Sequence, residues 1–150
     1  MKRVIIILFF MTLSLFGYQK GESVSPNILE KLNLQPDKTY IIDFFASWCE
    51  SCKKEMPLLI KVSKEIDKSK FELIGVDVDE KLSDGKEFQR DLNISFRVIN
   101  DPKNEIIKAF NPLGMPSLYV VKNGKVIDFL FGAKDNIDEL ILEEIKELSK

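Results

Sequence analysis

Apolar and polar positions along most of this chain follow a pattern that predicts alternating strands and helices. Residues 39–46 (TYIIDFFA) form a nearly unbroken apolar, β-branched and aromatic run, which is typical of a strand covered on both faces. Residues 50–68 then place apolar side chains at helical spacing with lysines between them, which predicts an amphipathic helix. Residues 71–78 predict a second buried strand. The first strand should therefore be central in a sheet.

The second half of the chain continues the alternation with shorter elements. Two strand-like runs, 117–121 and 125–131, are joined through Asn123-Gly124, a strong hairpin signal. An amphipathic helix is predicted over residues 135–148. The other predicted elements are short helices at 85–92 and 104–110 and a short strand at 96–99. This order predicts an α/β fold in which helices flank a central mixed β-sheet.

The amino terminus has the pattern of an export signal. Met1-Lys2-Arg3 is followed by an uncharged, strongly apolar run over residues 4–16. This run is shorter than the roughly 20 apolar residues that a spanning helix needs. We therefore expect residues 1–17 to be a cleaved signal peptide or a retained membrane anchor. Either places the protein in the periplasm or on the outer face of the cytoplasmic membrane.

Composition limits what the rest of the chain can be. Residues 18–37 are polar with Gly and Pro, which predicts a linker with a helical turn near 28–32, and residues 38–150 are long enough for one domain. The 22 basic and 24 acidic side chains are nearly balanced and dispersed. We therefore do not expect the protein to bind nucleic acid. We also expect it to be a monomer.

The chemistry available to this sequence is narrow. It contains no histidine, which excludes Ser/His and Cys/His catalysis and imidazole metal ligands. Its two cysteines, Cys49 and Cys52, are too close in sequence to staple a fold and too few for a four-ligand zinc site. We expect neither metal nor cofactor. At a predicted helix start, Cys49 can attack as a thiolate and Cys52, one turn on, can resolve the mixed disulfide.

Several separated motifs give the chain a family resemblance. They are DFFASWCESCKKEMP at residues 43–57, GMPS at 114–117, KNGK at 122–125 and Gly132. Over residues 38–150 the sequence resembles the thioredoxins, and more closely their exported TlpA/ResA/CcmG-like branch. The resemblance implies a thioredoxin-like fold, dithiol chemistry and a cis-proline at Pro116. The backbone of Met115 would then pair with an extended substrate, although Met115 also fits a plain packing role.

Three further residues are candidates for the site. Asp43 occupies the position of the buried carboxylate of thioredoxins and could take the proton of Cys52, unless it is paired with a lysine. Glu55 aligns with a glutamate of ResA-like proteins, and the alternative is a solvated surface residue. Trp48 is expected to cap the dithiol and contact partners, or merely to cover the helix end. How Asp43 and Glu55 share their roles stays open.

The residues between the cysteines indicate the direction of electron flow. Glu50-Ser51 offers no cation to a Cys49 thiolate, which favours a reductant of protein disulfides. The resemblance implies a DsbD/CcdA-like membrane electron donor and an apocytochrome c CxxCH site as acceptor. A disulfide oxidase or isomerase remains an alternative. A peroxiredoxin-like peroxidase would want a threonine just ahead of its cysteine, and a redox-inactive binding module would not need Cys52.

Overall fold

The computed structural model describes residues 17–150. The predicted leader, residues 1–17, lies outside the described residues except for Gly17. Within the described part, no helix is long and apolar enough to cross a membrane. The elements are α1 (Pro26–Leu32), β1 (Thr39–Phe45), α2 (Glu50–Glu65), β2 (Phe71–Asp77), α3 (Leu82–Asp91), β3 (Arg97–Asn100), α4 (Glu105–Phe110), β4 (Ser117–Lys122), β5 (Lys125–Phe131) and α5 (Ile137–Leu148).

The five strands form one mixed sheet in the order β3-β2-β1-β4-β5. β1 pairs in parallel with β2 and antiparallel with β4, so it is the central strand, and every one of its residues is buried. The β4–β5 hairpin turns through Asn123 (φ 51°) and Gly124 (φ 70°), the left-handed pair that a tight hairpin needs. The predicted α/β fold with a mixed sheet is confirmed.

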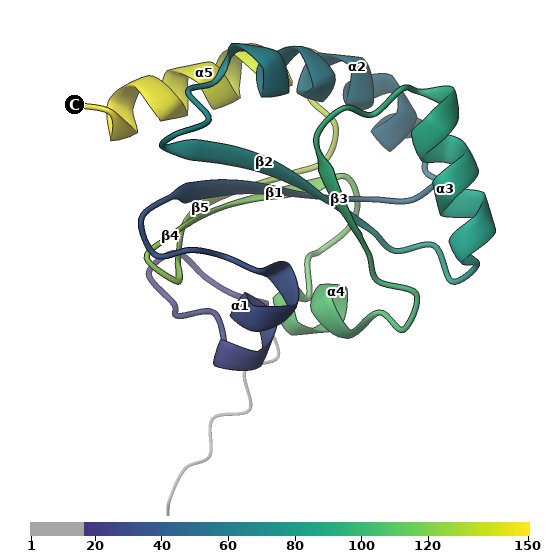
Figure 1. Cartoon of the computed structure of the whole chain (residues 1–150), viewed down its shortest axis with the longest axis horizontal. Coiled ribbons are helices and arrows are strands. Elements are labelled where there is room, and N and C mark those ends of the chain that lie inside the picture. Colours follow the sequence, from purple (N-terminus) through teal and green to yellow (C-terminus); the bar gives the residue numbers. More distant parts are fainter. Residues whose placement is uncertain (1–16) are drawn as a thin grey trace, which may run out of the picture.

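Helices cover both faces of this sheet (Figure 1). α2 and α5 pack together on one face, and α1 and α4 lie together on the other. α3 joins β2 to β3 and packs through Phe88, whose ring stacks on that of Phe45 with centroids 5.7 Å apart. Because every crossover between parallel strands runs through a helix, the carboxyl ends of β1, β2 and β3 all meet at one edge of the sheet.

The segment 18–37, predicted to be a linker, packs onto the domain. Val24, Ile28 and Leu32 are buried in the core. The extended stretch before α1 pairs with the start of β5: the Gly21 N–H donates to the Val126 carbonyl (2.7 Å) and the Val24 N–H to the Gly124 carbonyl (2.8 Å). The apolar spacing of α1 explains this packing, because one turn of helix puts Ile28 and Leu32 on the same face.

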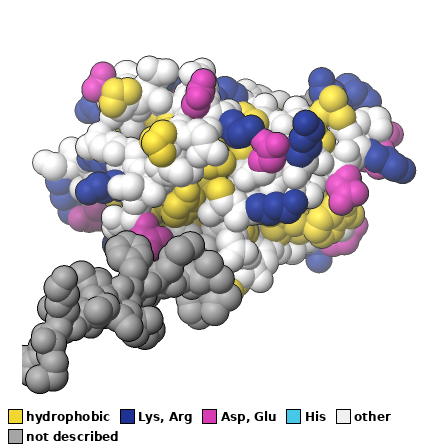
Figure 2. All heavy atoms as spheres, turned by 90° about the horizontal axis from the view of Figure 1, so that it is seen from below, with side chains coloured by type: hydrophobic (Ala, Val, Ile, Leu, Met, Phe, Trp, Pro, Cys, Tyr) yellow, Lys and Arg dark blue, Asp and Glu magenta, His cyan; other side chains and the backbone are white. Residues whose placement is uncertain are grey.

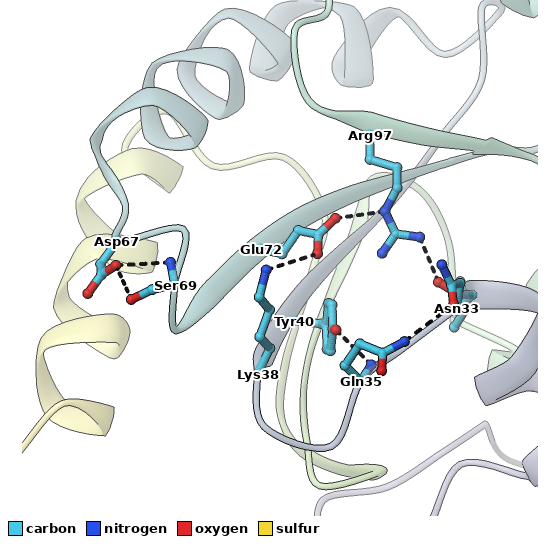
Figure 3. Close-up of polar contacts among 9 residues, drawn as sticks. Asn33, Gln35, Lys38, Tyr40, Asp67, Ser69, Glu72 and Arg97 are labelled. Atoms are coloured by element: carbon cyan, nitrogen blue, oxygen red, sulfur yellow. Dashed lines mark hydrogen bonds and ion pairs between the residues drawn. The ribbon is translucent and has the colours of Figure 1, made fainter.

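A polar cluster fixes the end of α1 against the amino ends of the parallel strands (Figure 3). The Glu72 carboxylate accepts from Arg97 Nε (2.7 Å) and lies 3.9 Å from Lys38 Nζ. Arg97 also donates to the Leu32 carbonyl at the end of α1 (2.8 Å). This cluster lies at the amino ends of the parallel strands, opposite the end of the sheet that carries the cysteines.

The face that carries α1 and α4 is shown in Figure 2. Lysine and arginine side chains are interspersed there with aspartate and glutamate, and apolar side chains show between them. Neither sign of charge gathers into one patch on this face.

Candidate active site

The two cysteines lie where the central strand passes into α2. β1 ends at Phe45 and α2 begins at Glu50, so the residues between them form a short turn at the carboxyl edge of the sheet. The Cys49 N–H closes this turn by donating to the Ala46 carbonyl (3.1 Å). Open α/β sheets place reactive groups at this edge. The turn thus presents Cys49 as the residue that caps the amino end of α2.

Cys49 and Cys52 form a disulfide in this structure, with their Cα atoms 5.2 Å apart. The Cys52 N–H donates to Cys49 Sγ (3.2 Å), and Ser51 Oγ lies 3.5 Å from the same sulfur. Cys49 is 7% exposed and Cys52 only 1%. Cys49 is therefore the more exposed of the two residues, and its sulfur accepts a hydrogen bond from a free amide of the helix terminus.

A groove opens beside Cys49 along the loop before β4. It has a volume of about 390 Å³ and is lined by Trp48, Cys49, Ile107, Lys108, Asn111, Pro112, Gly114 and Met115. The Met115–Pro116 peptide is cis, as the resemblance implied, and Pro116 is buried. The Gly132 N–H donates to the Pro116 carbonyl (2.9 Å), which holds this loop against the end of β5.

Two large apolar side chains stand in solvent around this groove. Trp48 is 66% exposed and Leu113, which the sequence analysis did not single out, is 81% exposed. Met115 is half-buried and lines the groove. Trp48 lines the groove next to Cys49 while most of its surface stays in solvent. An exposed indole beside a reactive sulfur is a surface on which a partner can pack.

Asp43 and Glu55 are two buried carboxyl groups on the α2 side of β1. Asp43 is 1% exposed, and neither of its oxygens has a hydrogen-bond partner. Burial, together with the nearby charge of Glu55, raises the pKa of Asp43 well above its ordinary value. No lysine pairs with Asp43 among residues 17–150. The paired-lysine alternative for Asp43 therefore does not describe this site.

Glu55 lies one turn beyond Cys52 on α2 and is buried, so it is not the solvated surface residue of the alternative reading. Burial raises the pKa of Glu55 to about 7. The Lys134 N–H, 3.4 Å from Glu55 Oε2, partly opposes this shift. A pKa of about 7 makes the charge of Glu55 change near neutral pH.

A second group of polar side chains at the same edge was missed by the sequence analysis. Asp77 ends β2, Asp79 follows it, and both are buried. Asp79 accepts two hydrogen bonds from Ser47, in the turn before Cys49. Burial raises the pKa of Asp77 to about 6. The available signal was an acidic residue at the end of a buried strand and another two positions later, which places them beside the end of β1. In the part of the chain that the structure describes, no cluster of Cys, Asp and Glu is arranged to hold a metal ion.

Comparisons with known proteins give this arrangement a family. The chain is 30% identical over 107 residues to the thiol-disulfide oxidoreductase ResA of Bacillus thuringiensis subsp. konkukian (strain 97-27), a match that covers 69% of this chain and 62% of the relative. The chain therefore spans less than two thirds of the length of that relative.

Two solved structures show that the fold is thioredoxin-like. One is a DsbE-like thiol:disulfide interchange protein from Chlorobium tepidum, with a TM-score of 0.75, 23% identity and coverage of 87% of this chain and 97% of that chain. The other is a secreted Mycobacterium tuberculosis disulfide oxidoreductase, with a TM-score of 0.65, 21% identity and coverage of 77% and 85%. The AhpC/TSA family model matches residues 19–129, from the stretch before α1 to the last strand, and on this match the chain belongs to the AhpC/TSA family.

Proposed function

We propose that this protein is an exported thiol-disulfide oxidoreductase that reduces disulfides in other proteins. The observation that carries the proposal is the Cys49–Cys52 disulfide, set at the amino end of α2 and beside a groove that can accept a polypeptide. The relative named as a thiol-disulfide oxidoreductase supports the same chemistry.

The reaction uses the two sulfurs in sequence. In the reduced protein the Cys49 thiolate attacks one sulfur of the substrate disulfide, and the other substrate sulfur leaves as a thiolate. Cys52 then attacks the Cys49 sulfur, and the second substrate sulfur leaves. Two electrons pass from the dithiol to the substrate, and the Cys49–Cys52 disulfide forms. The greater exposure of Cys49 supports its role as the attacking residue.

Substrate binding falls to the groove residues. An extended segment on either side of the substrate cysteine would pair with the backbone of Met115, which lines the groove next to the cis-proline. The exposed ring of Trp48 would cover the apolar side chains of that segment. Backbone pairing and apolar contact depend little on the amino-acid sequence of the substrate, which suits a protein with several substrates.

Proton transfer falls to the buried carboxyl groups. The Cys52 thiol is 1% exposed and must lose a proton before it can attack. Glu55 is on the same helix three residues later, and its pKa of about 7 lets it accept that proton at neutral pH. Burial raises the pKa of Asp43 well above its ordinary value, which disfavours a second negative charge beside Glu55.

The electrostatics favour electron donation to the substrate. The hydrogen-bonding neighbours of Cys49 Sγ are one backbone amide and the Ser51 hydroxyl, with no cation among them. A weakly stabilised thiolate makes the reduced form less stable and the protein more reducing. As a reductant outside the cytoplasm it needs a supply of electrons, for which we propose a DsbD/CcdA-like membrane donor, with an apocytochrome c among the acceptors.

Trapping of mixed disulfides tests the proposal. Cys52→Ser, expressed from the full chain in a Gram-negative host, should accumulate disulfide-linked partner proteins, and Cys49→Ser should accumulate none. The wild-type protein should reduce insulin disulfides with dithiothreitol as the electron source, and both variants should lose at least nine tenths of that rate. Equal trapping by the two variants would contradict the assignment of Cys49. Consumption of hydrogen peroxide without insulin reduction would favour the peroxidase alternative.

A further inference from the structure

A hydrogen-bonded clamp joins the end of β2 to the turn that carries Cys49. The Ser47 N–H donates to Asp79 Oδ2 (2.7 Å), and the Ser47 hydroxyl donates to Asp79 Oδ1 (2.7 Å). Both oxygens of Asp79 are therefore engaged by one residue, which lies two positions before the cysteine. These are the short distances of charge-assisted hydrogen bonds.

The parallel pairing of β1 with β2 brings these two residues together. The pairing continues one step past the strands, because the Val78 N–H donates to the Phe45 carbonyl (3.0 Å). The next residue, Asp79, is thereby directed at the loop that follows β1. Ser47 and Asp79 are 32 positions apart in sequence, so their contact depends on the register of this strand pair.

Asp79 is itself held from the side of α3. Its N–H donates to Asp77 Oδ1 (3.0 Å), and Asp77 Oδ2 accepts from Gln89 Nε2 (2.6 Å) on α3. The same Gln89 amide donates to Asn100 Oδ1 (2.9 Å) at the end of β3. A continuous chain of contacts thus runs from α3 and β3 to the turn before the dithiol, and Asp79 is its last member.

Asp79 is a buried carboxylate, and its burial costs free energy of hydration that its hydrogen bonds must offset. Asp79 is 5% exposed and forms no ion pair with any residue between 17 and 150. Removing a carboxylate from water without a cation carries a desolvation penalty, which the Ser47 donors offset. Those donors belong to the turn closed by the Cys49 N–H on the Ala46 carbonyl. Clamping Ser47 therefore fixes the backbone that leads directly to Trp48 and Cys49.

We propose that Asp79 is a positioning residue that holds the turn 46–49 through Ser47, so that the Cys49 sulfur stays where Cys52 can reach it. This inference rests on the proposed function, since positioning matters only if the dithiol is redox-active. Two sulfurs held in bonding geometry form a disulfide with a high effective concentration, and a looser turn lowers that concentration. Asp79 does not touch the reacting atoms and acts only through Ser47.

The test is the glutathione equilibrium of the full protein, in which reduced protein and glutathione disulfide give oxidised protein and two glutathione thiols. The constant is measured at one pH for all variants, and the pKa of the Cys49 thiol is titrated in each, so that a change in thiolate stability is distinguished from a change in geometry. Asp79→Ala should lower this constant about tenfold. Ser47→Ala, which loses the hydroxyl but keeps the backbone donor, should lower it about threefold.

Asp79→Asn separates geometry from charge. An asparagine oxygen can accept from the Ser47 N–H while its amide donates to the Ser47 oxygen, so the clamp survives without the charge. We expect a constant within about twofold of wild type. Asp91→Ala, the same substitution at an exposed residue at the end of α3, should change nothing.

Three outcomes would overturn the inference: an unchanged constant for folded Asp79→Ala, an unchanged constant for Ser47→Ala, or a loss for Asp79→Asn as large as for Asp79→Ala. If Asp79→Ala does not fold, the Ser47→Ala and Asp79→Asn pair still decides the matter. The glutathione equilibrium needs no protein substrate. Failure of insulin reduction and trapping would therefore remove the proposed function while leaving this measurement interpretable.

Discussion

At the scale of the residue, the burial of Glu55 makes the stability of the protein depend on pH. Its pKa is raised from 4.5 to about 7 by burial, so the folded protein holds a proton that the unfolded chain has released between these values. The free energy of unfolding must therefore fall as the pH rises from about 4.5 to about 7, and level off above that. Asp77, with a pKa raised to about 6, adds a fall of the same sign.

Glu55→Gln isolates the contribution of Glu55. The glutamine side chain stays neutral, so the variant should gain stability relative to wild type on going from pH 4.5 to pH 8, on the order of 2 kcal/mol after allowance for solvent screening. Urea unfolding of both oxidised proteins at the two pH values measures this difference. Glu87→Gln, at an exposed position of α3, is the matched control. Parallel pH curves for wild type and Glu55→Gln would show that Glu55 is not buried as described.

The same scale shows what the sequence could and could not predict about the site. Cys49, Cys52 and Pro116 stand inside contiguous motifs, and Asp43 and Glu55 stand at fixed offsets from the cysteines, so all five could be found by reading along the chain. For Asp79 the sequence offers only its place just after a buried strand, which does not identify its partner. Its partner Ser47 is remote in sequence, and their contact follows from strand register, which a single sequence does not specify.

At the scale of the element, α4 depends on one side chain for its start. Asp101 accepts from the backbone N–H groups of Glu105 (2.9 Å), Ile106 (2.9 Å) and Ile107 (3.0 Å), while Asn104 at the N-cap position makes no capping bond. A helix of six residues is too short to be stable from propensity alone. α4 also carries Ile107 and Lys108, which line the groove, so the position of this helix affects the site.

Asp101→Ala should therefore destabilise the protein by about 2 kcal/mol, at the upper end of measured capping effects, because three amide donors lose their acceptor. Urea unfolding measures the loss, and Asp37→Ala at an exposed position is the control. Asp101→Asn should lie between wild type and Asp101→Ala, since one amide oxygen can still accept. An unfolding midpoint for Asp101→Ala equal to that of wild type would contradict this account of α4.

The predicted start of α3 was wrong, and the packing of Gly85 shows how this glycine fits inside the helix. α3 begins at Leu82, three residues before its predicted start at Gly85. In the structure Gly85 is a packing residue: a Cβ atom there would lie 2.0 Å from Asp77 Oδ2. The absence of a side chain lets α3 lie against the carboxylate network at the end of β2. Close approach therefore explains the glycine better than chain termination does.

At the scale of the whole molecule, the segment before β1 belongs to the domain. Its polar composition predicted a linker, but the three buried residues of this segment are spaced so that each contributes to the core. The Arg97 contact to the end of α1 adds a fixed point (Figure 3). The segment was predicted to be a linker because its average composition is polar. Its packing depends on only a few apolar positions, which an average over the segment conceals.

The direction of electron flow is also a property of the whole molecule, because folding and redox state are linked. If the protein is a reductant, folding lowers the potential of its dithiol below that of the unfolded chain, so the oxidised form must be the more stable to unfolding. For an oxidant the order is reversed, since folding then stabilises the thiolate. Each 30 mV of potential corresponds to about 1.4 kcal/mol of this difference.

We therefore expect oxidised protein to unfold at a higher urea concentration than reduced protein, with a gap in unfolding free energy on the order of 1–3 kcal/mol. Glu50→His should narrow the gap, because replacing an anion beside the Cys49 sulfur with a neutral or cationic ring lowers the pKa of the thiol and stabilises the reduced form. Glu87→His, at an exposed position on α3, should leave the gap as it is. A reduced form more stable than the oxidised form would mean that the amide at the start of α2 stabilises the thiolate more than the nearby carboxylates oppose it, and the protein would then accept electrons from its partners.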